Sequence, residues 1–356
     1  MGQKILISTG GSGGHVVPAT ILYEHLKNQF QVFMTIDNRG IKFLNKNKYN
    51  IEIIDVPQIS KNFFLLPFQF FTMIYIIIKS IIFLKKKNID TLISTGGYMS
   101  LPLCLASKIL NIKLLLFEPN IVLGRSNKFF IKSCKKIFCY TDKIKNFPKK
   151  YLNKISVIPA LLRKEFYEIK RAENIDSCIN LLVVGGSQGA KIFDTLVKKS
   201  IVDLSKKYTL KIYQQTNAFN FEELEKFYKN ENINHSIFDF DEDILNIMSR
   251  SNLCITRAGA STLAEIVFLN LPSIVIPLPT SKDNHQFENA IFYNKMGCNW
   301  ILNQNEIEDE TITNKLDNII DNKDEYLSKK MNMKNFSYQN TWNNINQKII
   351  SVINEN

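Results

Sequence analysis

The sequence predicts an α/β fold made of two doubly wound, Rossmann-like domains. Three observations support this class. Short aliphatic runs alternate with helix-length stretches, a glycine-rich loop follows the first run at 10–14, and the same arrangement begins again at 179–189. Strands that read as continuous apolar runs are typical of a parallel sheet with helices on both faces. With 356 residues, the chain is long enough for two cores.

The first half of the chain contains six predicted strands. They lie at 4–9, 31–36, 51–56, 90–95, 113–118 and 136–140. The segment 16–28, which follows the glycine-rich loop, has the apolar spacing of a helix. A strand, a glycine loop and a helix in this order are typical of the start of a doubly wound domain.

The second half repeats this order. Strands are predicted at 179–184, 209–215, 235–240, 252–256 and 273–278, and a second glycine loop at 185–189 precedes a helix at 192–204. A strand near the middle of the chain ends at Pro159, which indicates a domain boundary. We therefore expect an N-terminal domain at 1–160 and a C-terminal domain at 161–335. A helix at about 336–356 is expected to pack back on the first domain.

Basic residues are concentrated in the first domain. Residues 1–160 contain 23 Lys and Arg against 7 Asp and Glu, whereas residues 161–356 contain 22 against 26. The asymmetry indicates an anionic partner for the first domain, either lipid or nucleic acid, unless these lysines only solvate the surface. The six cysteines are scattered and form no CxxC pair, which is typical of reduced thiols.

The segment 62–88 is the most apolar in the chain and ends in three lysines, Lys85, Lys86 and Lys87. A single membrane span is excluded if the strands on either side of it belong to one sheet. The eleven residues between Pro67 and Lys79 are also fewer than the roughly 20 that a span needs. Two interpretations remain: a buried helix, or a helix that enters the membrane surface without crossing it.

The glycine loops predict phosphate-binding sites. Loops of this kind bring backbone N–H groups and the positive end of a helix dipole to an anion, although a tight turn without a ligand has the same sequence. His15 lies at the start of the helix after the first loop, and Asp37 follows the next strand, where an acidic residue can bind a ribose. Two glycine loops in two domains favour a cleft that holds two substrates over a lone dinucleotide site.

A third group of polar residues follows the strand at 252–256. Arg257 ends this strand, a tight turn at 258–260 follows, and the helix after it carries Glu265. Glu265 is placed either to bind a ribose diol or only to interact with the helix dipole. Gln286 lies in a polar helix start further along, where an amide can bind sugar hydroxyls.

The chain resembles the MurG family, the bacterial peptidoglycan N-acetylglucosaminyltransferases, in stretches that span both domains. These are GGSGGHVVPA, STGGYMSLP, FEPNIVLGRSNK, VVGGSQGAK, and TRAGASTLAEI with LPSIVIPLP and DNHQFENA. The resemblance implies the GT-B fold, in which two doubly wound domains face each other across a cleft. It also implies transfer of GlcNAc from UDP-GlcNAc to the MurNAc 4-hydroxyl of lipid I, with inversion, to form lipid II and UDP.

The resemblance also assigns residues to the two substrates. The residues expected to bind the donor are Arg163, Ser187, Gln188, the backbone at Phe240 and Asp241, Ala260, Ser261, Glu265 and Gln286. Those expected from the first domain are Ser12, Gly13, Gly14, His15 and Asn120, with Tyr98 facing the acceptor. Helix N–H groups, together with Arg257 or Arg163, are suited to stabilise the leaving UDP, so we expect neither a metal nor another cofactor.

An inverting transfer needs a base for the acceptor hydroxyl. His15 is the first candidate, with an orienting role as its alternative, and Glu118 is the second. The family usually has a histidine where this chain has Phe117, so a mechanism that needs an imidazole at that position does not apply directly.

Two other functions are open at this level: an epimerase that acts on UDP-GlcNAc at carbon 2, and a non-catalytic nucleic-acid-binding protein. The first domain has few carboxylates for epimerase chemistry, and no basic-aromatic recognition motif supports nucleic acid. We therefore expect no nucleic-acid partner. The expected partners are UDP-GlcNAc, lipid I, the anionic cytoplasmic leaflet and, as a possibility, proteins of cell-wall synthesis. The expected location is the cytoplasmic face of the bacterial inner membrane.

Overall fold

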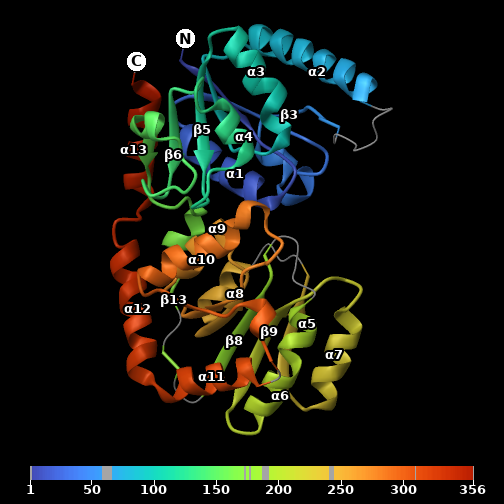
Figure 1. Ribbon diagram of the computed structural model, residues 1–356, viewed down its shortest axis with the longest axis vertical. Helices are drawn as coiled ribbons and strands as arrows, with labels where there is room; N and C mark the ends of the chain where they lie inside the picture. The colour runs from blue at the N-terminus through green and yellow to red at the C-terminus, as the bar shows by residue number, and fades with distance from the viewer. Residues whose placement is uncertain are drawn as a thin grey trace. The chain divides into compact units, whose positions relative to one another are not determined.

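The structure is a computed structural model that describes residues 2–57, 66–171, 174–175, 178–186, 192–239, 244–308 and 310–355. The chain forms two compact units (Figure 1). Unit 1 comprises Met1–Leu161 and Trp342–Asn356, and unit 2 comprises Leu162–Thr341. Both are parallel α/β units, which confirms the predicted fold class.

Unit 1 contains a seven-stranded parallel sheet in the order β3-β2-β1-β4-β5-β6-β7. Its strands are β1 (Lys4–Ser8), β2 (Gln31–Ile36), β3 (Ile51–Ile53), β4 (Thr91–Ser94), β5 (Lys113–Glu118), β6 (Lys136–Cys139) and β7 (Ile155–Val157). The six predicted strands are present. The strand that the sequence places before Pro159 is also present, as the three-residue edge strand β7.

Helices and 3-10 turns connect these strands. The helices are α1 (Gly13–Leu26), α2 (Leu66–Lys87), α3 (Leu101–Ile109), α4 (Arg125–Phe130) and α13 (Trp342–Asn354). The 3-10 turns are η1 (Ile41–Phe43), η2 (Lys46–Lys48), η4 (Tyr98–Ser100) and η5 (Lys149–Lys154). Aliphatic side chains from the sheet, α2 and α3 form one core.

The C-terminal helix α13 packs on unit 1. The ring of Trp342 stacks on His25 of α1 with 3.7 Å between ring centroids. At the other end of the helix, Lys113 Nζ donates to the carbonyl of Ile353 at 2.8 Å and also to that of Glu355. A cation at the C-terminus of a helix satisfies carbonyls that have no partner within the helix, so Lys113 fastens α13 to β5.

Unit 2 contains a six-stranded parallel sheet in the order β10-β9-β8-β11-β12-β13. Its strands are β8 (Ile179–Val184), β9 (Leu210–Gln215), β10 (Asn234–Phe238), β11 (Leu253–Thr256), β12 (Ser273–Val275) and β13 (Asn299–Ile301). The edge strand β13 was not predicted.

Eight helices and three 3-10 turns are described in this unit. The helices are α5 (Phe193–Leu196), α6 (Lys198–Ser205), α7 (Phe221–Asn230), α8 (Ile244–Arg250), α9 (Ala260–Phe268), α10 (His285–Lys295), α11 (Thr311–Asp321) and α12 (Lys323–Ser337). The turns are η6 (Lys164–Tyr167), η7 (Lys282–Asn284) and η8 (Gln304–Glu306).

Helix α2 differs from its prediction in length. It runs through Lys79 without a break and has 22 residues, so the argument that the segment is too short to span a membrane is wrong. The stretch Pro67–Lys87 is long and apolar enough to cross a membrane by length and composition. The topological argument holds, because β3 and β4 lie on either side of α2 in the sequence and belong to one sheet. A single crossing would place these strands on opposite sides of the bilayer.

The exposed face of α2 is largely apolar, whereas its polar residue Ser80 faces the protein. Phe71, Ile78 and Ile82 are 68%, 51% and 60% exposed, whereas Ser80 is fully buried. The hydroxyl of Ser80 donates to the carbonyl of Ile76 at 2.8 Å within the helix, which makes its burial inexpensive. The alternative that the whole segment is a buried helix is therefore wrong.

Candidate active site

The candidate residues of unit 1 lie at the carboxyl edge of its sheet. Strand β1 lies inside the sheet, with β2 on one side and β4 on the other. Ligands of doubly wound sheets bind at such a switch point. The first glycine loop (residues 10–14) follows β1, and the loop 95–99 follows β4, so the two loops are neighbours.

His15 lies in the first turn of α1 and contacts both loops. Its Nδ1 lies 2.8 Å from the carbonyl oxygen of Thr95. A carbonyl only accepts, so Nδ1 carries the proton and Nε2 holds the lone pair of the neutral ring. A Cβ added at Gly97, where φ is +80°, would lie 3.2 Å from His15 Cδ2. Glycine at position 97 thus gives the imidazole its space, and in the neutral ring the lone pair that a general base requires lies on Nε2.

Glu118, at the end of β5, is buried and fully engaged by hydrogen bonds. Its Oε1 accepts from the backbone and side-chain nitrogens of Asn120 at 3.2 and 3.0 Å. Its Oε2 accepts from Gly124 N at 2.7 Å and from Asn127 Nδ2 at 2.9 Å. These four donors hold the carboxylate inside the loop 118–124. The geometry favours an orienting role for Glu118 over that of the base.

Phe117 occupies the position of the usual family histidine. It is fully buried, and its ring packs edge-on against Tyr140 with 5.7 Å between centroids. Asn127, which the sequence analysis did not single out, donates to the carbonyl of Phe117 at 3.0 Å as well as to Glu118. Asn127 lies within the quoted stretch FEPNIVLGRSNK, and its position three residues after the loop 118–124 was the only available signal.

The remaining residues of unit 1 lie around His15. Ser12 precedes α1 without capping it through its side chain, and Gly13 and Gly14 are the first two residues of the helix. Tyr98 begins η4, directly after Gly97. Burial raises the pKa of Tyr98, and the charge of the nearby Arg39 acts in the opposite direction. These residues therefore form one group with His15 at the ends of β1 and β4.

In unit 2, Gly185 and Gly186, which begin the second glycine loop, and the start of α9 lie at the ends of neighbouring strands. β8 and β11 pair in parallel, so their carboxyl ends coincide. A Cβ added at Gly186, where φ is +81°, would lie 3.8 Å from Thr262 Oγ1 of α9. Ala260 and Ser261 are the first residues of α9, and no side chain caps this end. The N–H groups of this helix end are suited to a phosphate.

Gln286 and Asn289 hold the turn that precedes α9. Gln286 Oε1 accepts from Ala258 N at 3.3 Å and from Leu278 N at 3.0 Å. Asn289 Nδ2 donates to the carbonyl of Ala258 at 3.1 Å. Because the oxygen of Gln286 is occupied, its amino group is the part of the side chain that can donate to a ligand hydroxyl.

Arg257 is directed into the protein. Its Nη1 donates to the carbonyl of Ile276 at 2.9 Å, its Nη2 donates to Gln304 Oε1 at 2.7 Å, and the guanidinium lies 5.1 Å from the centroid of the Phe193 ring. Only 7% of Arg257 is exposed. This geometry favours a role in positioning the end of β11 over direct contact with a leaving diphosphate.

Glu265 and Arg163 interact electrostatically within unit 2. Burial raises the pKa of Glu265 to about 6, and the charge of Arg163 acts in the opposite direction. Glu265 lies in the second turn of α9, the helix whose residue Thr262 lies near Gly186. A carboxylate with a pKa near 6 accepts hydrogen bonds from a diol at neutral pH and loses this ability in mild acid.

Several predicted residues lie outside the described part of the chain. These are Ser187, Gln188, Phe240 and Asp241. Within the described residues, no group of three or more His, Cys, Asp or Glu side chains is placed to hold a metal ion.

A further polar cluster of unit 2 was missed by the sequence analysis. Asp194 of α5 is buried and accepts from Gln214 Nε2 at 3.1 Å, Thr216 Oγ1 at 2.8 Å and Asn220 Nδ2 at 2.7 Å. It fixes the loop after β9, and Gln215 at the end of β9 accepts from Gly185 N at 3.1 Å. The partners of Asp194 lie 20 to 26 positions away, so no local pattern marks it.

Comparison with known proteins identifies the family. Residues 5–139 match the N-terminal domain of glycosyltransferase family 28, and residues 180–345 match its C-terminal domain. The UDP-N-acetylglucosamine–N-acetylmuramyl-(pentapeptide) pyrophosphoryl-undecaprenol N-acetylglucosamine transferase of Pelagibacter ubique is 65% identical over 356 residues, which is 100% of both chains. The enzyme of the same name from Rickettsia bellii is 32% identical and covers 90% of this chain and 91% of its own.

A solved structure has the same fold. MurG of Acinetobacter baumannii superposes with a TM-score of 0.77 over 99% of both chains, at 24% identity. The two parallel sheets, the glycine loop in each half of the chain and the relatives that match the whole chain all indicate the same family. The chain therefore belongs to glycosyltransferase family 28 and, within it, to the MurG family of N-acetylglucosamine transferases.

Proposed function

We propose that this protein transfers GlcNAc from UDP-GlcNAc to the MurNAc 4-hydroxyl of lipid I and releases lipid II and UDP. The observation that carries this proposal is the 65% identity to a transferase of that name over the whole of both chains. The orientation of His15 supports it, because a neutral imidazole with its lone pair on Nε2 can accept a hydroxyl proton.

The chemistry requires one displacement. The acceptor hydroxyl transfers its proton to His15 Nε2 while its oxygen forms a bond to the anomeric carbon of GlcNAc. The bond from that carbon to the diphosphate breaks, and UDP leaves with the electron pair. N–H groups at the start of α9 stabilise the negative charge on the leaving group. Attack opposite the leaving group inverts the anomeric centre.

Donor recognition is assigned to unit 2. Glu265 accepts hydrogen bonds from the ribose hydroxyls, and the amino group of Gln286 donates to a sugar hydroxyl. Arg257 positions the end of β11, and Asn289 positions Ala258 in the turn that follows it. In unit 1, Glu118 orients Asn120 toward the acceptor.

We infer that α2 docks the enzyme on the anionic cytoplasmic leaflet, where the acceptor is embedded. The exposed apolar face of α2 supports this, as do the exposed lysines Lys85 and Lys86 at its C-terminal end. Lys87 packs over the ring of Phe33 at 5.2 Å from its centroid, so it is not assigned to the headgroups. The protein is thereby a peripheral protein of the inner membrane.

Incubation with radiolabelled UDP-GlcNAc and a short-chain lipid I analogue tests the transfer. We expect label in the lipid product and equimolar UDP. If the label stays out of the lipid while UDP-ManNAc or free GlcNAc accumulates, the transferase proposal fails in favour of an epimerase or a hydrolase.

A further inference from the structure

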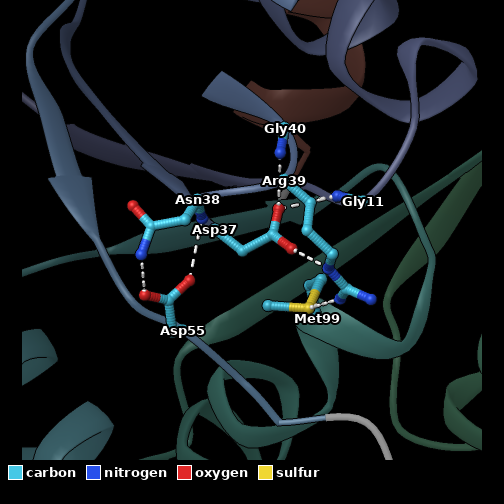
Figure 2. Close-up of polar contacts among 7 residues, drawn as sticks. All are labelled: Gly11, Asp37, Asn38, Arg39, Gly40, Asp55 and Met99. Carbon is cyan, nitrogen blue, oxygen red and sulfur yellow. Dashed lines mark hydrogen bonds and ion pairs between the residues drawn. The ribbon is translucent and has the colours of Figure 1, made fainter. Parts of the chain in front are cut away.

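Asp37, at the carboxyl end of β2, is not available to bind a ribose. Only 2% of it is exposed, and its two oxygens accept from three donors (Figure 2). Oδ1 accepts from Gly11 N at 2.7 Å and from Gly40 N at 3.0 Å. Oδ2 accepts from Arg39 Nε at 2.6 Å. The sequence-based suggestion that Asp37 binds a ribose hydroxyl is therefore not supported by this geometry.

The bond to Gly11 ties the first glycine loop to the loop after β2. Gly11 has a φ of +80°, and a Cβ added at Gly10 would lie 2.5 Å from Asp37 Oδ1. Glycine is needed at position 10 for this close approach. The neighbouring Asn38 is held in turn, because its backbone N–H donates to Asp55 Oδ1 at 2.8 Å at the end of β3. The base of the loop 37–40 is thus fixed from two sides.

Arg39 extends from this base to the loop after β4. Figure 2 shows its guanidinium between Asp37 and Met99, with Nη2 in contact with Met99 Sδ. Its charge also acts on the pKa of Tyr98. Arg39 therefore reaches the loop that holds His15 through Thr95 and Gly97. Asp37 and Arg39 together join the two loops on either side of the imidazole.

The outer part of Arg39 remains accessible. Its side chain is 42% exposed, and within the described part of the chain its Nη1 group has no hydrogen-bond partner. Asp37 offsets the charge of Arg39 only in part, because two backbone N–H groups also bind that carboxylate. A pre-oriented guanidinium with free donors is suited to bind a phosphate oxygen.

We propose that Arg39 is an acceptor-recognition residue that binds the anionic diphosphate of the lipid substrate, and that Asp37 is a positioning residue that orients it. The inference rests on the proposed function, since it takes its ligand from that reaction. The acceptor carries a diphosphate between its sugar and its polyprenyl chain. Arg39 holds that group beside Tyr98 and so places the sugar hydroxyl near His15.

The test compares Arg39→Gln, Arg39→Lys and Lys42→Gln in the full chain. Lys42 is an exposed lysine three residues further on, so its variant loses the same charge without losing the oriented donors. Steady-state rates are measured with UDP-GlcNAc and short-chain lipid I in detergent, which removes effects of membrane docking. We expect Arg39→Gln to raise the KM for lipid I about tenfold or more, the scale of one lost charge-assisted hydrogen bond. The KM for UDP-GlcNAc should stay within about twofold of the wild-type value.

Arg39→Lys is expected to recover part of the loss, because it keeps the charge and lacks the planar fork. Lys42→Gln is expected to match the wild type. An unchanged lipid I KM in Arg39→Gln overturns the inference, as does a fall in kcat alone or an equal effect in Lys42→Gln. A lower melting temperature together with a raised KM for both substrates would assign Arg39 a structural role and also overturn it. A wild-type enzyme that is inactive on lipid I would overturn the proposed function itself, which separates the two failures.

Discussion

Replacing Phe71 and Ile78 by glutamine is expected to weaken binding to anionic vesicles while the fold stays intact. The two residues lie seven positions apart on α2, so they share one face of the helix, and they are 68% and 51% exposed. Ile76 is unsuitable for this purpose because it is only 6% exposed and packs in the core of unit 1. A change at Ile76 would test folding instead of docking.

The magnitude follows from the exposed fractions. Full burial of a phenylalanine or isoleucine side chain contributes about 1.5–3 kcal/mol. Scaled by their exposed fractions, the two side chains contribute about 2 to 4 kcal/mol together when they enter the acyl boundary. Since about 1.4 kcal/mol corresponds to a factor of ten, the vesicle partition coefficient should fall by about 30-fold or more.

Flotation with vesicles of mixed anionic and zwitterionic lipid measures the partition coefficient. Phe219→Gln serves as the matched control, because Phe219 is 97% exposed in unit 2 and lies outside α2. The double variant should lose activity on membrane-embedded lipid I and keep it on short-chain lipid I in detergent. An unchanged partition coefficient, or an equal loss in Phe219→Gln, would refute the docking role of α2.

Varying the salt concentration distinguishes the electrostatic contribution to membrane docking from the apolar contribution. Lys85→Gln with Lys86→Gln should weaken vesicle binding at low ionic strength by roughly 1 kcal/mol per lysine. This difference from the wild type should disappear at high salt, where exposed charges are screened, whereas the defect of the apolar variant should persist.

Three further predictions concern titratable groups. His15→Ala should lower kcat by roughly 10²-fold or more with UDP-GlcNAc binding unchanged, and near-normal turnover would exclude the base role. The KM for UDP-GlcNAc should rise as the pH falls below about 6, because protonated Glu265 no longer accepts two hydrogen bonds. Glu265→Gln should remove this dependence of KM on pH. A wild-type KM that does not change between pH 7 and pH 5 would contradict the prediction. Burial lowers the pKa of His25 to about 4, so below pH 6.5 the unfolded chain binds a proton that the folded chain does not, and the free energy of unfolding falls. Between pH 7 and pH 5 the free energy of unfolding should fall by about 2 kcal/mol because of His25. Urea unfolding of the wild type and of His25→Phe at the two pH values measures this difference. An equal pH dependence in the two proteins would disprove the prediction.

The fold and the family follow from local patterns. Strands of four to six residues that are buried on both faces read as aliphatic runs, and the glycine loops after β1 and β8 are short contiguous motifs. Such signals depend on neighbours in the sequence, so they are readable without coordinates. The edge strand β13 has three residues and does not lie within a longer aliphatic run, so it was not predicted.

The roles of single charged residues do not follow from local patterns. From the sequence, Asp37 and Arg257 are polar residues at strand ends, and both positions are typical of ligand contacts. Their partners lie far away along the chain: Asp37 binds Gly11, 26 positions away, and Arg257 binds Gln304, 47 positions away. A hydrogen bond over such a separation exists only once the sheet brings the two loops together.

Helix α2 shows the same division in one element. Its composition indicated an apolar helix that ends in lysines before β4, but not the 22-residue length of that helix. Only the tertiary structure decided which face meets the protein, and it turns Ser80 inward while Phe71, Ile78 and Ile82 remain exposed. The physical reason is that burial depends on the surface against which a helix packs, which here is α3, and that surface is assembled from residues more than a dozen positions away.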